Sequence, residues 1–137
     1  MKINKLLMVA IAFALLAAGG PALAEADIRH EQVQFQKGTS GATVKGSIKG
    51  RQVIDYRLRG AAGQNMDITL KASKTSAYFN VLATDDTPLF IGSLSGNQFS
   101  GLLPKDGEYT IRVYLTGNAA SSNQSADFTF DLSLIHI

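Results

Sequence analysis

The sequence contains no cysteine and only two histidines, and both shortages restrict its chemistry. Without cysteine there is no disulfide, no thiol nucleophile and no cysteine-ligated metal. The histidines, His30 and His136, lie far apart in the sequence. We therefore expect no enzymatic activity, no catalytic residue, no metal site and no cofactor. A fold without disulfides must be stabilised by its hydrophobic core alone.

The first 24 residues have the three regions of a secretory signal peptide. Two lysines open the chain, an apolar run follows from Leu6 to Ala18, and Ala22-Leu23-Ala24 has the small-x-small pattern of a cleavage site. The run is too short to cross a bilayer, and no cysteine follows for a lipid anchor. We expect residues 1–24 to be removed and residues 25–137 to form one exported, periplasmic domain.

Charges in the expected mature chain balance. Lys2 and Lys5 lie in the leader, so 11 of the 13 basic residues remain to face 11 acidic ones. A chain without net charge has no overall electrostatic attraction to nucleic acid or to an anionic membrane surface. We therefore expect neither nucleic acid nor a membrane anchor among its partners.

Apolar and polar residues alternate along much of the chain, which is the pattern of half-buried β-strands. Gly, Pro, Asn and Asp separate these segments, and none shows a sustained helical period. About eight short strands predict an all-β fold, an antiparallel, jelly-roll-like β-sandwich in a single domain. The clearest segments are 53–59, 66–72, 109–115 and 128–134, and the shorter ones are 32–36, 42–48, 78–84, 89–92 and 99–103.

The alternation also predicts which side chains face the core. In segment 53–59, Ile54, Tyr56 and Leu58 share one face, so Asp55 and Arg57 are expected to face solvent. Residues 25–31 have the character of a frayed lead-in, whereas the apolar tail 134–137 is expected to extend the last strand. Residues 116–126 form the longest stretch without a strand pattern, and this uncharged segment is either a binding loop or slack.

Two charged groups allow a functional and a plainer interpretation. Basic residues at 45–59 fit a solvated sheet face, but the Lys49-Gly50-Arg51 turn could also present a cation to an acidic partner. Asp85-Asp86 fits a hairpin turn better than a calcium site, because no Asp-x-Asp-x-Asp-Gly loop surrounds it.

Short motifs occur along the chain in an order and spacing that resemble a known family. They are Phe35-Gln36-Lys37-Gly38, Gly46-Ser47-Ile48-Lys49-Gly50, Tyr56-Arg57-Leu58 with Gly63-Gln64, Leu103 to Val113, Asn118 with Ala120, and Asp131-Leu132. Together they resemble the periplasmic inhibitors of goose-type (g-type) lysozyme of Gram-negative bacteria, from about Val33 to Leu134. The resemblance implies that loops at one end of the sandwich enter the active-site cleft of that enzyme, its protein partner.

The resemblance also implies which residues bind the partner. The basic candidates are Lys49, Arg51 and Lys105, the last beside Asp106 in its turn, and the hydrogen-bonding candidates are Asn118, Ser121 and Ser122. Three positions differ from the family pattern. Arg51 replaces an aromatic residue, Asp106 a small polar residue and Ser121 an arginine. The cation is therefore expected from the Lys49-Gly50-Arg51 turn, because residues 117–125 contain none.

A second resemblance supports an alternative function. The Tyr-x-Leu…Gly-Gln and Asp-Gly-x-Tyr-x-Ile-Arg-Val patterns, at 56–64 and 106–113, are similar to the pre-peptidase C-terminal (PPC) domain, a sandwich found beside secreted proteases. The alternative is a secreted binding module for cell-wall glycan or for another exported protein. Exposed aromatic residues would favour glycan, and Tyr114 is the clearest candidate.

The leader gives the first testable prediction. The protein recovered from the periplasm should begin at Glu25, because Ala22-Leu23-Ala24 offers the small residues that signal peptidase accepts. Intact-mass spectrometry of the periplasmic fraction measures this directly. Recovery of the chain with Met1 still attached would contradict the prediction.

Overall fold

The computed structural model describes residues 28–136, and the predicted leader lies outside this range. Two very short helices, α3 (Gly92–Ser95) and α4 (Gly117–Ser121), accompany the strands, and no described helix is long and apolar enough to span a membrane. The strands are β1 (Ile28–Gln32), β2 (Gly41–Lys49), β3 (Val53–Gly60), β4 (Gln64–Ala72), β5 (Ala77–Leu82), β6 (Pro88–Ile91), β7 (Gln98–Leu102), β8 (Gly107–Leu115) and β9 (Ser125–His136).

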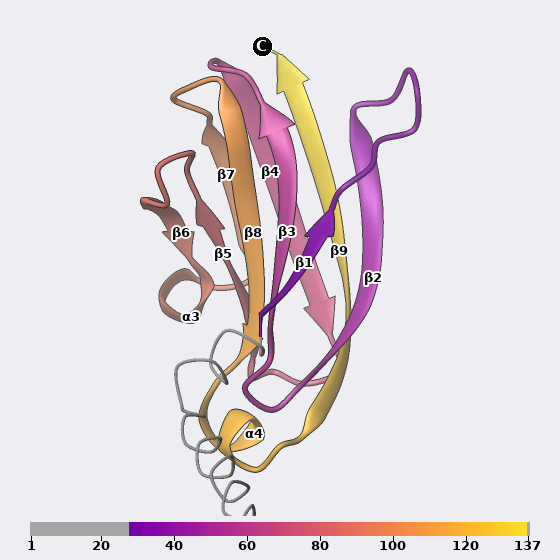
Figure 1. Cartoon of the computed structure of the whole chain (residues 1–137), viewed down its shortest axis with the longest axis vertical. Coiled ribbons are helices and arrows are strands. Elements are labelled where there is room, and N and C mark those ends of the chain that lie inside the picture. The colour runs from indigo at the N-terminus through magenta and orange to yellow at the C-terminus, as the bar shows by residue number, and fades with distance from the viewer. Residues whose placement is uncertain (1–27, 137) are drawn as a thin grey trace, which may run out of the picture.

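The strands form two sheets that pack face to face (Figure 1). One sheet has the order β1-β3-β8-β5-β6 and the other the order β2-β9-β4-β7. The predicted all-β sandwich is therefore confirmed, with nine strands among residues 28–136 where about eight were expected.

Apolar residues from both sheets form one core between them. The four clearest alternating segments turn their predicted faces inward, as the fully buried Ile54, Met66, Tyr109 and Phe130 illustrate. Tyr56 meets the ring of Phe130 edge-on at a centroid distance of 5.1 Å. Such pairs add to the free energy gained by burying the rings. The pattern of the sequence therefore predicted the core correctly.

The two ends of the described chain join the sheets. The expected frayed lead-in, residues 25–31, is wrong for residues 28–31, because these belong to β1, which pairs in parallel with β3. The five-stranded sheet is therefore not wholly antiparallel, and residues 25–27 lie outside the described residues. The edge of β3 that faces away from β8 needs hydrogen-bonding partners, and β1 supplies them. At the other end β9 runs to His136, which confirms for residues 134–136 that the apolar tail extends the last strand, and Ile137 lies outside the described residues.

Two further expectations change. Residues 33–36 of the predicted strand 32–36 are not a strand, because β1 ends at Gln32, although Val33 and Phe35 still pack against the core. The segment 116–126 is not an extended loop, because α4 occupies its first half and buries Ala119. A buried alanine holds this helical turn against the sandwich, so the segment is ordered rather than slack.

Asp55 is the main exception to the predicted faces. It lies on the outer side of β3 but is only 2% exposed, because Arg112 of β8, its cross-strand neighbour, covers it. The Nε and Nη2 atoms of Arg112 donate to the two carboxylate oxygens at 2.7 and 2.9 Å. Hydrogen bonding to Asp55 raises the pKa of the Arg112 guanidinium above its usual value, although burial acts in the opposite direction.

The core assignment predicts the effect of one substitution. Phe130→Ala should lower the free energy of unfolding by about 3–5 kcal/mol, because it leaves a cavity against Tyr56. Equilibrium urea unfolding measures this loss. Ile135→Ala is the control, since Ile135 lies on the same strand but is 50% exposed. A loss below about 1 kcal/mol for Phe130→Ala would contradict its place in the core.

Candidate partner-binding surface

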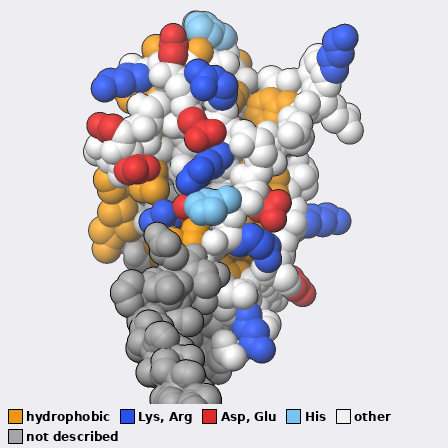
Figure 2. Space-filling model, viewed as in Figure 1, with side chains coloured by type: hydrophobic (Ala, Val, Ile, Leu, Met, Phe, Trp, Pro, Cys, Tyr) orange, Lys and Arg blue, Asp and Glu red, His pale blue; other side chains and the backbone are white. Residues whose placement is uncertain are grey.

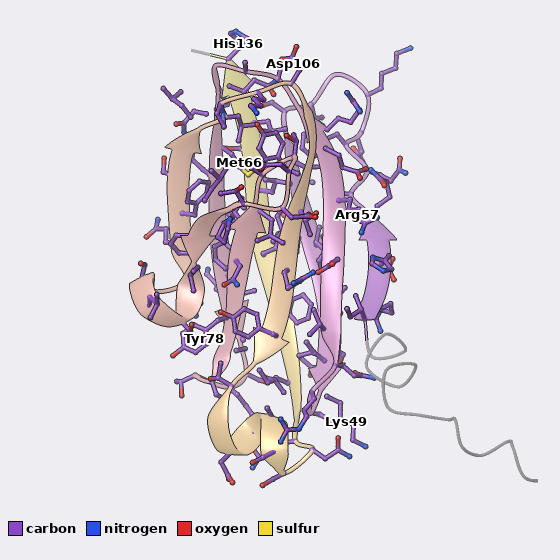
Figure 3. All side chains as sticks on the ribbon, turned by 60° about the vertical axis from the view of Figure 1, so that its left-hand side comes forward. Lys49, Arg57, Met66, Tyr78, Asp106 and His136 are labelled. Atoms are coloured by element: carbon purple, nitrogen blue, oxygen red, sulfur yellow. The ribbon has the colours of Figure 1, made fainter. Side chains whose placement is uncertain are left out.

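The seven residues predicted to bind a partner divide between the two ends of the sandwich. At one end β2 turns into β3, and α4 lies at that same end (Figure 1). At the opposite end β7 turns into β8. Figure 3 shows Lys49 and Asp106 at these opposite ends. The first end carries Lys49, Arg51, Asn118, Ser121 and Ser122, and the other carries Lys105 and Asp106.

The seven residues therefore do not form one surface. Each strand crosses the sandwich once, and the five strands β3 to β7 separate the turn at 50–52 from the turn at 103–106. An odd number of crossings places the two turns at opposite ends. The same five strands are visible as alternating segments in the sequence, so counting them would have separated the two groups.

Lys105 and Asp106 take part in a structural turn. The Tyr109 hydroxyl donates to the Lys105 carbonyl at 2.6 Å and accepts from its backbone N–H at 3.1 Å. Asp106 Oδ1 accepts from the Ala62 N–H at 2.8 Å. The Asp106 carboxylate thus fixes this turn to the loop between β3 and β4, while the Tyr109 hydroxyl holds the backbone of Lys105 within its own turn.

We call the other group of loops the contact end, which comprises residues 49–52 and 116–124. Its polar side chains are exposed but ordered by bonds within α4. Ser122 donates from its hydroxyl to Asn118 Oδ1 at 3.0 Å and from its backbone N–H to the Asn118 carbonyl at 2.8 Å. The Gln124 N–H donates to the Ala119 carbonyl at 3.0 Å, which closes the segment. These bonds hold the exposed Asn118, Ser121 and Ser122 together on one helical turn.

The two loops of the contact end are joined through their backbones. The Gly50 N–H donates to the Gln124 carbonyl at 2.8 Å. Gly50 has a φ of 60°, and a Cβ at this position would overlap the Asn123 side chain and lie 3.3 Å from its Cα. Asn123 is itself left-handed, with a φ of 57°. Only glycine lets the two loops approach this closely, so the contact end is one rigid unit.

Both cations of the contact end come from the β2–β3 turn. Lys49 and Arg51 line a hollow of about 390 Å³ together with Ala120, Ser121 and Asn123 of the other loop. The Gln52 side chain accepts the Lys49 N–H at 3.0 Å, which fixes the turn between the two basic residues. An exposed guanidinium and ammonium therefore stand beside hydroxyl and amide groups, an arrangement suited to carboxylates. The sequence does not indicate that Asn123 belongs to this hollow, and the only sign of a close neighbour is the glycine at position 50.

The acidic pair forms a turn, as predicted. Asp85 Oδ1 accepts the Thr87 N–H at 3.2 Å, and hydrogen bonding to Thr87 lowers the pKa of Asp85. Asp86 has a φ of 68°, a conformation that aspartate tolerates in tight turns. Within residues 28–136, no three His, Asp or Glu side chains gather in a way that could hold a metal ion.

Comparisons with known proteins agree with the first resemblance. No family model matches the chain. The inhibitor of g-type lysozyme from Escherichia coli K12 is 28% identical over 138 residues, which cover 98% of this chain and 99% of that protein. The crystal structure of PliG, a periplasmic inhibitor of g-type lysozyme from Aeromonas hydrophila, is 30% identical. It matches with a TM-score of 0.71 over 78% of this chain and 96% of that one.

The second resemblance holds for the fold. The pre-peptidase C-terminal domain of a Bacillus anthracis collagenase matches with a TM-score of 0.50 and 21% identity, over 78% of this chain and 93% of that one. At this identity the match describes a shared sandwich and not a shared activity.

Two glycines with the same φ give a matched test of the joined loops. Gly50→Ala should destabilise the protein by about 1 kcal/mol more than Gly117→Ala. Both residues have a φ of 60°, but a Cβ at Gly117 meets no atom within 4 Å, whereas one at Gly50 meets Asn123. Thermal or urea unfolding of the two variants measures the difference. Equal losses would mean that Asn123 yields freely and that the loops are not tightly joined.

Proposed function

Because the chain belongs to the family of periplasmic inhibitors of g-type lysozyme, we propose that it inhibits such an enzyme by inserting its contact end into the active-site cleft. The protein is a binding protein and not an enzyme, and it acts in the periplasm. Residues 1–24 are the proposed export signal. The observation that carries the mechanism is the rigid contact end, which places the cations of Lys49 and Arg51 beside the hydroxyls of α4.

The chemistry of the enzyme explains why a cation suits this role. Glycosidases commonly use two carboxyl groups that flank the scissile bond. Arg51 is exposed at the tip of the turn, and its planar guanidinium can bind a carboxylate through two hydrogen bonds without losing its charge. Binding of this kind satisfies the acidic groups and excludes the sugar from the cleft.

The hydroxyl and amide groups of α4 complement this contact. Asn118, Ser121 and Ser122 are exposed and uncharged, so they can exchange hydrogen bonds with the polar groups that line a sugar-binding cleft. They carry less of the binding energy than Arg51, because neutral hydrogen bonds at an interface largely replace bonds to water.

Rigidity of the contact end favours tight binding. A flexible loop loses conformational entropy when it enters a cleft, and this loss weakens association. The bond from Gly50 to Gln124 and the closed turn of α4 fix both loops in the unbound protein. Most of that ordering is therefore complete before the partner arrives.

Three alanine substitutions test the mechanism. Arg51→Ala should raise the inhibition constant for a g-type lysozyme about 30-fold or more, because a desolvated carboxylate would lose its partner. Ser121→Ala should raise it only a few-fold, and Lys105→Ala, at the opposite end, should leave it unchanged. The inhibition constants are measured from the rate of cell-wall lysis at increasing inhibitor concentrations.

The results separate the function from the site. Failure of the wild-type protein to inhibit any g-type lysozyme would remove the proposed function and leave the alternative of a secreted binding module. Inhibition that survives Arg51→Ala would keep the function but reject this cation. A large effect of Lys105→Ala would move the contact to the other end of the sandwich.

A further inference from the structure

A groove runs along the outer face of the five-stranded sheet and reaches the contact end. It consists of two hollows of about 750 and 440 Å³ that share Asn80 and Arg112 in their linings. The larger hollow, which we call the upper one, extends to His30 and Asp86. The smaller hollow, which we call the lower one, extends to Arg51 and Ala120. Figure 2 shows basic and acidic side chains interspersed on the face over β1, β3 and β8.

Arg112 lies in the middle of this groove in a fixed orientation. Asp55 accepts two of its five N–H donors, and the Arg112 side chain remains 37% exposed, so donors are left for a ligand. Asp55 itself is nearly inaccessible, with a side chain that is 3% exposed. An ion pair with one buried partner contributes little net stability, because removing the charge of Asp55 from water offsets much of the attraction. Orientation of the guanidinium is therefore the clearest role for Asp55.

The wall beside Arg112 is equally ordered. The Tyr114 hydroxyl donates to Asn80 Oδ1 at 2.7 Å, and the Gly92 N–H donates to the same oxygen at 3.2 Å. Tyr78 lies next to the Tyr114 ring, with a centroid distance of 6.4 Å. The predicted exposed aromatic, Tyr114, is thus half-buried and held in place. Fixed tyrosine and arginine side chains around a hollow are typical of the strongest contacts in protein interfaces.

The charges of the groove favour an acidic occupant. Its lining contains three arginines, Arg51, Arg57 and Arg112, against two aspartates. Asp55 and Arg112 pair with each other. Arg51 and Arg57 then face Asp86 alone, so the lining has a net excess of one positive charge. A negatively charged side chain of a partner would therefore find an excess of cationic donors here.

The position of the groove favours one partner. Arg51 and Ala120 belong both to the lower hollow and to the contact end. An enzyme bound at the contact end would therefore also lie over the mouth of the groove. We propose that the interface with g-type lysozyme continues into this groove, where Arg112 binds an acidic side chain of the enzyme and Asp55 positions Arg112. This inference rests on the proposed function and adds a second cation to it.

Two conservative variants and one matched control test the proposal. Arg112→Lys keeps the charge but loses the planar guanidinium, and should raise the inhibition constant about 10-fold, mainly through faster dissociation. Arg59→Lys makes the same change on the same sheet face, outside both hollows, and should have no effect.

Asp55→Asn separates the effect of charge from the effect of the orientation of Arg112. It removes a negative charge, so a purely electrostatic groove would bind an acidic partner more tightly. If Asp55 positions Arg112, binding should instead weaken about 3-fold or more.

Inhibition constants and dissociation rates are measured on folded protein, with melting temperatures recorded in parallel. Arg112→Lys and Arg59→Lys acting alike would overturn the proposal, while a large effect of Arg51→Ala in the same series would still support the proposed function. A lower melting temperature for Asp55→Asn with an unchanged inhibition constant would also overturn it, because Asp55 would then be purely structural. Specific binding of a carboxylated cell-wall fragment, muramyl dipeptide, that is lost in Arg112→Lys would assign the groove to glycan instead. An inactive wild-type protein would remove the proposed function and this inference together.

Discussion

The architecture depends on the pairing of one strand, β9, which lies between β2 and β4 in the four-stranded sheet. It pairs with the whole length of each neighbour, from Gly41 to Lys49 on one side and from Gln64 to Ala72 on the other. Its inward face supplies Phe128, Phe130, Leu132 and Leu134 to the core. In a chain without disulfides these contacts must hold the sheet together, and they link residues that are far apart in the sequence. Strand pairing of this long-range kind is slow to form but cooperative once formed.

The packing of the two sheets also determines how rigid the contact end is. One of its loops joins β2 to β3 and therefore connects the two sheets, and the other joins β8 to β9 and connects them again. Each loop is thus fixed at both ends by a different sheet, and the bond from Gly50 to Gln124 ties them to one another. A surface built in this way cannot shift without moving both layers of the sandwich. Precise presentation of Arg51 is a property of the whole fold rather than of one turn.

Local pattern predicted most of the fold, because alternation and turn residues are local signals. Segments 53–59, 109–115 and 128–134 are strands with the expected inward faces. The burial of Asp55 was not predictable in this way, since its partner Arg112 lies on another strand and only the cross-strand register brings them together. The parallel strand β1 was missed for the same reason, because its five residues are mostly polar and are ordered by the free edge of β3.

The candidate site was predicted in part. The sequence indicates the Lys49-Gly50-Arg51 turn and the segment 116–126 as two separate candidates, and the fold places them side by side. The order of motifs in the sequence does not show at which end of the sandwich each turn lies. Lys105 and Asp106 therefore resemble members of the same site in the sequence, although the five strands between the turns place them at the opposite end. The contribution of Asn123 depends on its left-handed backbone and on its contact with a glycine far away in the chain. Residue types alone do not reveal such a contact.

The late position of β9 in the chain also has a consequence for export. A polypeptide that crosses a membrane through a narrow channel must travel as an unfolded thread, and early folding would obstruct its passage. Here β2 and β4 cannot complete their sheet until residues 125–136 have been synthesised, because β9 separates them. The order of strands therefore determines when the four-stranded sheet can be completed. Closure of the core must wait until the end of synthesis, which is compatible with transport of a chain that has not yet folded.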